Sequence, residues 1–292
     1  MDFFNQVLEP GLATGATAGL FALAFVVVYR VTGVLNFAHG QLVMLMPLMV
    51  LVLTNHWGVP LAASFVLAAA IVLGTGLVEE RIAIRPFMQS GHALTWILST
   101  LGFSVVLSEL MAIPYQGQTV AFPWGVSAKA HAIAGVSYSW ADVITLVTFI
   151  SLVAVLSILK TRTVTGLRLL AVSQDKLGAA SLGISPAAAS RVAVSIASVI
   201  AMATGVLVVS TQLVTPGVGL TVLFNGFIAA AVGGLDSIAG TLVGAFVVGV
   251  VGQAISVYVN GQYVNSVLFS VLLVVCLFRP NGILGRVSVR SV

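Results

Sequence analysis

Long apolar runs, separated by short polar connections, make up almost the whole chain. A helix needs about 20 apolar residues to cross about 30 Å of bilayer hydrocarbon. On that measure the pattern predicts membrane-spanning helices near residues 11–29, 34–53, 60–78, 94–112, 142–159, 191–213, 218–234, 238–258 and 263–278. Two of them, 34–53 and 218–234, are also compatible with broken or re-entrant helices. We therefore expect an all-α, polytopic membrane protein with about eight or nine transmembrane helices in one domain over residues 1–292.

The polar segment 160–191 is dense in basic side chains. They are Lys160, Arg162, Arg168, Lys176 and Arg191. Basic residues near the ends of membrane helices stay on the cytoplasmic side. Nine crossings that start outside also put the other basic clusters there, namely Arg30, Arg81, Arg85, Arg279, Arg286 and Arg290, and leave Lys129 outside. We therefore expect an external N-terminus, a cytoplasmic C-terminus, a cytoplasmic loop over 160–191 and an external loop over 113–141.

Local signals predict folded structure within the segment 160–191. Gly183 before apolar Ile184 suits the left-handed end of a short helix that begins near Arg168. Ser185 and Pro186 are typical of the N-cap and first position of a following helix. The segment is thus either a solvated loop or a docking surface for a cytosolic partner.

Composition excludes several classes of protein. With 59% hydrophobic and 7% charged residues, the chain lies far from soluble composition. Its formal charge of +4 comes from clustered basic residues, which indicates membrane topology and argues against nucleic-acid binding. Cys276 is the sole cysteine, so neither a disulfide framework nor a multi-cysteine metal site is possible. The stretch MDFFNQVLEP has no basic residue, so we expect the first apolar run to be a retained span, not a signal peptide.

The sequence also lacks the common catalytic motifs. It contains no phosphate-binding loop ending in Gly-Lys-Ser/Thr, no H-E-x-x-H and no G-x-S-x-G. We therefore expect no ATP hydrolysis and no other enzymatic activity in this chain.

Glycines at four-residue spacing predict close helix packing. Gly11, Gly15 and Gly19 form such a stripe in the first span, and Gly240 and Gly244 repeat it in the eighth.

Polar groups beside glycines mark candidate positions for a hinge or a translocation path. In the stretch Gly33 to Gly40, Asn36 and His39 are three residues apart, which would put them on one face of a helix. Such groups within a membrane face protein or a water-filled path. A structural hydrogen-bond network and a direct transport role both fit, and we favour a hinge here.

A second polar stretch lies in the last third of the chain. Asn225 is an amide within its span, for which packing and solute contact fit equally well. Gly233 and Gly234, followed by Asp236 and Ser237, predict a tight break capped into the next helix.

Acidic residues are scarce inside the apolar runs. Glu109 is the carboxylate that we place within one, near its outer end, where hydration or a substrate role is possible. Residues 79–92 read as a cytoplasmic connection, in which Arg85 and Pro86 mark a turn and a second contact for the partner of 160–191.

Four stretches together resemble the permease subunits of the branched-chain amino-acid ABC importers. They are Val34 to Gly40, Gly166 to Asp175 leading into Ser181 to Ile184, Ala229 to Gly240, and Phe278 to Gly285. The chain departs from the family pattern at Leu170, Lys176-Leu177, Gln41 and Met46-Pro47. These departures bear on the cognate ATPase surface and on solute specificity.

The resemblance implies a multi-pass permease of the bacterial inner membrane that works within a larger complex. Its partners would be a second homologous permease or another copy of itself, two cytosolic ATP-binding subunits and an extracytoplasmic solute-binding protein. ATP and magnesium would bind on the partner subunits, and this chain would hold no cofactor. The expected solute is an amino acid, with urea or a short amide as the alternative. A stand-alone secondary transporter or channel is the competing class.

The resemblance also assigns roles to particular residues. The coupling element would run from Arg168 to Ile184. The expected coupling residues are Gly166, Arg168, Gln174, Asp175, Leu182, Gly183 and Arg85. Independently of the resemblance, the polar groups beside glycines give the expected path or hinge residues, which are Asn36, Phe37, His39, Gly40, Asn225, Gly233 and Gly234.

Overall fold

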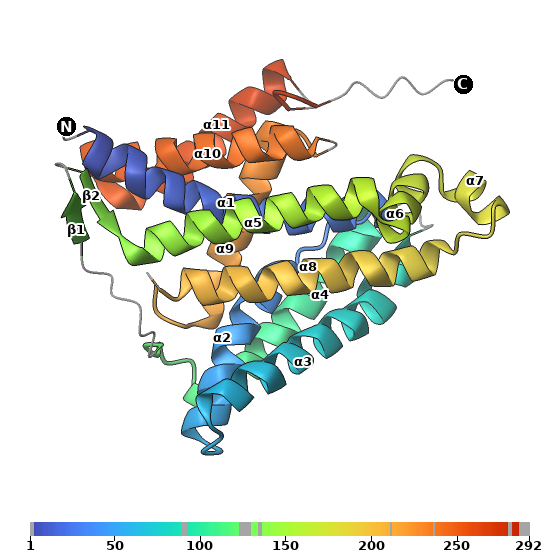
Figure 1. Ribbon diagram of the computed structural model, residues 1–292, viewed down its shortest axis with the longest axis horizontal. Helices are drawn as coiled ribbons and strands as arrows, with labels where there is room; N and C mark the ends of the chain where they lie inside the picture. The colour runs from blue at the N-terminus through green and yellow to red at the C-terminus, as the bar shows by residue number, and fades with distance from the viewer. Residues whose placement is uncertain are drawn as a thin grey trace. The chain divides into compact units, whose positions relative to one another are not determined.

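The computed structural model describes residues 3–88, 93–122, 130–133, 136–210, 212–235, 237–279 and 282–285. This part of the chain is helical except for a short hairpin and the connecting segments (Figure 1). The longer helices are α1 (Glu9–Thr32), α2 (His39–Asn55), α3 (Leu61–Glu79), α4 (Ala93–Ala112), α5 (Trp140–Arg162), α8 (Pro186–Val208), α9 (Pro216–Gly233), α10 (Ile238–Ile255) and α11 (Val264–Phe278). The shorter ones are α6 (Val164–Gln174) and α7 (Lys176–Ser181).

Tighter or wider helical turns extend several of these helices. They are η1 (Phe4–Leu8), η2 (Glu80–Ile84), η3 (Arg85–Phe87), η4 (Ile113–Tyr115), η5 (Ser256–Asn260) and η6 (Gly261–Tyr263). The hairpin pairs β1 (Ala130–Ile133) with β2 (Val136–Ser139) in antiparallel register, with Ala130 opposite Ser139. It lies in the predicted external loop, where the sequence signals no strand. Trp124 and Lys129, which we also expect in this external loop, lie outside the described residues.

The predicted all-α membrane architecture is confirmed. Within the described residues, six helical stretches are long and apolar enough to span a membrane: Asn5–Thr32, Leu61–Phe87, Leu94–Tyr115, Trp140–Arg162, Pro186–Val208 and Ile238–Phe278. The helices His39–Asn55 and Gly217–Gly233 are apolar but shorter. These two are the segments that the pattern marks as candidates for re-entrant helices. Their path through the bilayer, and the side on which each terminus lies, stay predictions.

Contacts divide the chain into two compact units. Unit 1 comprises Met1–Val26, Val126–Phe149 and Phe224–Val292, and unit 2 comprises Val27–Gly125 and Ile150–Leu223. A single permease domain over all residues stays a prediction.

In unit 1, helix α1 packs closely against α10 through glycine. A Cβ atom added to Gly11 would lie 2.9 Å from the Cα of Val250, and one added to Gly15 would lie 2.9 Å from the carbonyl oxygen of Ala245. Gly249 faces the backbone of Gly11 and Gly15 from the other side. The predicted glycine stripe is thus confirmed as a packing surface, because no larger residue fits between the two backbones.

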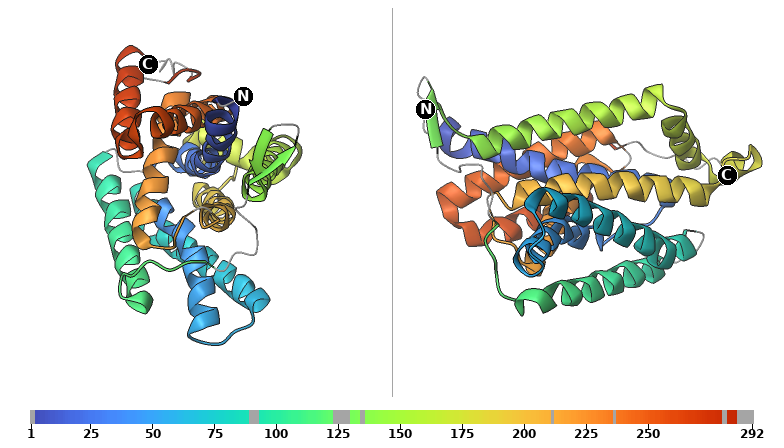
Figure 2. Two further views of the ribbon diagram at one scale, coloured as in Figure 1. Left: turned by 90° about the vertical axis from the view of Figure 1, so that its left-hand side faces the viewer. Right: turned by 60° about the horizontal axis from the view of Figure 1, so that its bottom comes forward.

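In unit 2, helix α2 packs against both α3 and α8. Helices α3, α4 and α8 run lengthwise in the right-hand view of Figure 2, whereas α2 runs across them. Gly205 on α8 meets the backbone of Val43 on α2, and Gly76 on α3 meets Ser198 on α8. Small residues on α3 and α8 therefore allow these helices to approach one another closely.

The third predicted span ends too early. Helix α3 continues through η2 and η3, so that Leu61–Phe87 is one helical stretch. Residues 79–87 are therefore not a connecting loop, and both Glu79 and Glu80 are 0% exposed. The wide turn η2 has i→i+5 geometry, which brings Arg85 back onto Glu80 and lets a charged pair continue the helix.

Candidate functional site

The segment 160–191 forms two short helices, α6 and α7, instead of the single helix predicted from Arg168 to Gly183. Asp175 ends α6 in an extended conformation, with φ −149° and ψ 107°. Its carboxylate then accepts a hydrogen bond at 2.9 Å from the backbone N–H of Leu177 and so caps the N-terminus of α7. A side chain that satisfies a free N–H outside the helix competes with helix continuation, which explains the break.

The predicted corner between α7 and α8 is confirmed. Gly183 has φ +81°, and the backbone N–H of Ile184 closes the turn on the carbonyl of Ala179 at 3.0 Å. Ser185 then caps α8 by accepting from the N–H of Ala188 at 3.3 Å, and Pro186 is the first helical residue. Local chemistry alone specifies this corner.

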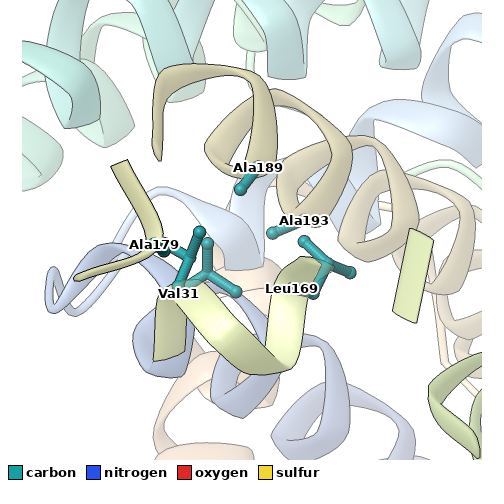
Figure 3. Close-up of a cluster of buried hydrophobic side chains, with 6 residues drawn as sticks. Val31, Leu169, Ala179, Ala189 and Ala193 are labelled. Atoms are coloured by element: carbon teal, nitrogen blue, oxygen red, sulfur yellow. The ribbon is translucent and has the colours of Figure 1, made fainter. Parts of the chain in front are cut away.

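The inner face of the segment 160–191 rests on a small apolar cluster in unit 2 (Figure 3). Its buried members are Val31, Leu169, Val172, Ala179, Ala189 and Ala193. They come from α1, α6, α7 and α8. The two short helices are thus seated on the end of α1 and the start of α8 by apolar contacts.

The outer face of α7 is apolar and open. Leu177 is 84% exposed and Leu182 is 81% exposed, whereas Ala179 between them is 4% exposed. Arg168, Gln174 and Asp175 are exposed nearby in sequence. Two protruding leucines flanked by polar groups are typical of a surface that a partner protein covers.

Lys176 makes long-range hydrogen bonds that the sequence does not predict. Its Nζ donates to the carbonyl of Thr32 at 2.6 Å and to that of Met88 at 3.4 Å. Burial lowers the pKa of the Lys176 ammonium group below its usual range. In the sequence Lys176 stands out as a member of the basic cluster and as a departure from the family pattern, and neither signal reveals hydrogen-bond partners so distant in sequence.

Two of the expected coupling residues have structural contacts of their own. Gly166 is buried at the corner between α5 and α6, where a Cβ atom would meet the backbone of Leu159. The Arg85 side chain donates two hydrogen bonds to the carboxylate of Glu80. The neighbouring carbonyl of Met88 accepts a hydrogen bond from Lys176, so residues near Arg85 do contact the segment 160–191. The contact with a partner protein that we predict at Arg85 stays a prediction.

The predicted pairing of Asn36 and His39 on one helix face is wrong. Helix α2 begins at His39, and Asn36 lies in the non-helical stretch before it. The Oδ1 of Asn36 accepts a hydrogen bond at 2.9 Å from the N–H of Ala38, which forms a local turn. Its amide faces the carboxyl group of Glu79 without a well-aligned hydrogen bond in the described residues.

The neighbours of Asn36 are tightly packed. His39 is 1% exposed, and Phe37 is half-buried. A Cβ atom on Gly40 would meet the backbone of Gly219, and one on Gly219 would lie 2.7 Å from the carbonyl oxygen of Gly40. The glycines therefore allow a close backbone approach between the start of α2 and the start of α9, and the hinge role stays a prediction.

Three of the expected path residues belong to unit 1. Asn225 is half-buried on α9, and its Oδ1 accepts no hydrogen bond from the residues that the structure describes. Gly234 has φ +111°, and a Cβ atom on Gly233 would meet the carbonyl of Gly240. The predicted break and the cap at Ser237 are confirmed, while Asp236 lies outside the described residues.

The helices and buried polar groups described above are those of a multi-pass membrane protein. The chain belongs to the family described as branched-chain amino acid transport system / permease component, whose model matches residues 7–277. In bacteria, a multi-pass permease of this family lies in the inner membrane.

Named relatives and one solved structure show similarity along nearly the whole chain. The "High-affinity branched-chain amino acid transport system permease protein LivH" of Salmonella typhimurium is 30% identical over 306 residues, covering 99% of this chain and 98% of that protein. The permease protein BraD of Pseudomonas aeruginosa is 29% identical, with 99% and 98% covered. The solved structure "PsaBC from Streptococcus pneumoniae in complex with Fab" aligns over 91% of this chain and 89% of that chain, at TM-score 0.49 and 13% identity.

Proposed function

We propose that this chain is the transmembrane permease subunit of an ATP-driven importer for a small polar solute, with a branched-chain amino acid as the first candidate. Membership of the family and the names of the relatives support this class of solute. Urea or a short amide is the alternative, because Gln41 and Met46-Pro47 depart from the family pattern near the start of α2.

The observation that carries the proposal is the outer face of α7. Leu177 and Leu182 are exposed at the two ends of α7, whose N-terminus is capped by Asp175. Ala179, on the opposite face of this helix, is buried. Exposed apolar side chains on a folded turn gain free energy when a partner covers them, because apolar surface is then removed from water. The partners that fit are two cytosolic ATP-binding subunits, which would hold ATP and magnesium.

The complete importer would contain further partners. A second permease, either homologous or another copy of this chain, would complete the membrane part. An extracytoplasmic solute-binding protein would deliver the solute. The catalytic step would then belong to the ATP-binding subunits, and this chain would supply the path and the docking surface.

Reconstitution tests the proposal. The chain is purified from membranes with the ATP-binding and solute-binding proteins of its own organism and placed in liposomes. We expect uptake of labelled leucine, isoleucine or valine that requires ATP inside and the binding protein outside. Solute uptake by this polypeptide alone, driven by an ion gradient, would overturn the assignment. Uptake of urea in place of amino acids would keep the class and change the solute.

Glu79 favours one second candidate, an ion-coupled carrier. Its carboxyl group is fully buried, and the described residues include no Lys or Arg salt bridge to it. Intramembrane acids are common in carriers coupled to protons or cations. The same liposomes decide between the two, because a pH or sodium gradient would then replace ATP as the driving force.

A further inference from the structure

Lys176 joins three segments of unit 2 that are far apart in sequence. Its Nζ donates to the carbonyl of Thr32 at 2.6 Å and to that of Met88 at 3.4 Å. Thr32 is the last residue of α1, and Met88 caps the turn η3. Lys176 is itself the first residue of α7. A single side chain therefore connects α7 to the ends of two other helical stretches.

The chemistry of these contacts favours a cation. The last carbonyls of a helix lack partners within the helix and carry the negative end of its dipole. An ammonium group offers several donors and a full positive charge, so it can satisfy carbonyls from two segments at once. The half-buried site limits the access of water that could replace these bonds.

Gly33 provides the space that the Lys176 side chain needs. It follows Thr32 with φ +74°, a conformation that glycine adopts readily. A Cβ atom at this position would lie 3.2 Å from Nζ of Lys176. The end of α1 is therefore shaped to receive this ammonium group.

Helix α7 is short, and it also packs against α6 and α8. The helix has six residues, and Ala179 is its one buried side chain. Asp175 caps the helix, but this hydrogen bond is internal to the segment. The Lys176 contacts thus tie α7 to α1 and η3 through side-chain hydrogen bonds.

We propose that Lys176 is a positioning residue for the coupling step. Its side chain fastens α7 to the end of α1 and to the turn at Met88, so that the three segments move together. This inference rests on the proposed function, in which the ATP-binding subunits dock on α7. A displacement of α7 by those subunits is then passed to two membrane helices through one ammonium group. Without it, the apolar contacts of Ala179 are left to join α7 to the end of α1.

Three variants of the reconstituted complex test this inference. Lys176→Met keeps the length and apolar stem but removes charge and donors, while Lys176→Arg keeps both. Lys160→Met removes a positive charge from the same segment and is the matched control. We expect Lys176→Met to retain bound ATP-binding subunits and ATP hydrolysis but to lose most of the solute transported per ATP. Lys176→Arg should recover much of this ratio, and Lys160→Met should keep it.

Hydrogen exchange supplies a structural readout that does not depend on transport. In Lys176→Met the amide protons of α7 should exchange about tenfold faster than in the wild type, since a bond to a charged group is lost. In Lys160→Met they should not. If Lys176→Met fails to accumulate in membranes, Lys176→Gln and Lys176→Arg are compared in its place, and the expected order of transport per ATP is Arg above Gln.

The outcomes separate this inference from the proposed function. If the wild-type complex shows no ATP-driven uptake, the proposed function itself is wrong. A wild-type chain with such uptake, together with a Lys176→Met variant that matches Lys160→Met in transport per ATP and in exchange, overturns only the role of Lys176. Equal ratios for the Arg and Gln variants would overturn it as well.

Discussion

The guanidinium group of Arg85 donates to both carboxylate oxygens of Glu80, with 3.1 Å between Nε and Oε1 and 2.5 Å between Nη2 and Oε2. The Glu80 side chain is fully buried and that of Arg85 is 27% exposed. Two parallel hydrogen bonds of this kind fix geometry as well as charge. The pair thus holds η2 and η3 in line with α3.

Arg85→Met should destabilise the protein strongly. The substitution leaves a buried carboxylate without its partner, which costs about 2–4 kcal/mol when the partial exposure of Arg85 is considered. Thermal unfolding of the purified chain in detergent measures the loss. The double variant Glu80→Met with Arg85→Met should recover most of it, because the buried charge is then gone. Equal stability of the single and double variants would contradict this account.

Gly15→Val should separate α1 from α10. A Cβ atom at Gly15 already lies 2.9 Å from the carbonyl oxygen of Ala245, and valine adds two methyl groups. We expect a loss of about 1–3 kcal/mol in the free energy of unfolding. Gly74→Ala is the control, because a Cβ atom there meets nothing within 4 Å and alanine favours the helix. A neutral Gly15→Val would contradict the close packing.

Asp175→Lys should abolish transport while membrane insertion and the solute affinity of the binding protein stay intact. The substitution removes the cap on α7, worth about 0.5–2 kcal/mol, and reverses a charge beside the outer face. Asp175→Asn is the matched control, since asparagine caps a helix equally well.

Gly183→Pro should also abolish transport, as Asp175→Lys does. Proline lacks the N–H that Gly183 donates to the carbonyl of Ala180 at 3.0 Å. Normal solute-stimulated ATP hydrolysis in Asp175→Lys would count against the coupling role.

Asn36→Asp should lower stability more than Asn36→Ala lowers it. Both variants remove the amide that faces Glu79, but aspartate also adds a carboxylate at a buried position beside a second carboxyl group, where burial disfavours its charged form. Glu79→Gln should rescue Asn36→Asp and leave Asn36→Ala unchanged. A double-mutant cycle on thermal unfolding measures the coupling between the two positions. Additive effects would show that Asn36 and Glu79 do not interact.

Asn225→Ala should reduce transport while stability holds, as expected if this amide lines the path. Its Oδ1 accepts no hydrogen bond from the described residues, so truncation removes no structural bond that the structure shows. Uptake and unfolding temperature are compared in the same preparation. Wild-type transport in this variant would remove Asn225 from the path.

Local chemistry accounts for what the sequence could predict. Runs of about 20 apolar residues specify helices whatever their neighbours, because the bilayer demands internal hydrogen bonds. Gly183, Ser185 and Pro186 specify the corner before α8 for the same local reason. Glycines every four residues likewise predict a smooth face, although the partner α10 could not be read from the spacing.

Long-range relationships account for what the sequence could not predict. Nothing near Glu79 in sequence reveals that it is buried, since the helix is apolar on all sides and shows no single inner face. The break at Asp175 depends on whether its carboxylate caps a new helix or points to solvent, and both fit the sequence. Lys176 finds its acceptors only in the folded chain.

The separation of 144 residues between Lys176 and Thr32 has a consequence for biosynthesis. A ribosome that adds about 5–20 residues per second finishes α1 roughly 7–30 s before it adds this lysine. During that interval the carbonyl at Thr32 must be satisfied by water or by lipid headgroups. The carbonyl at the end of α1 therefore gains its final hydrogen-bond donor only after the ribosome has added Lys176, in the second half of the chain.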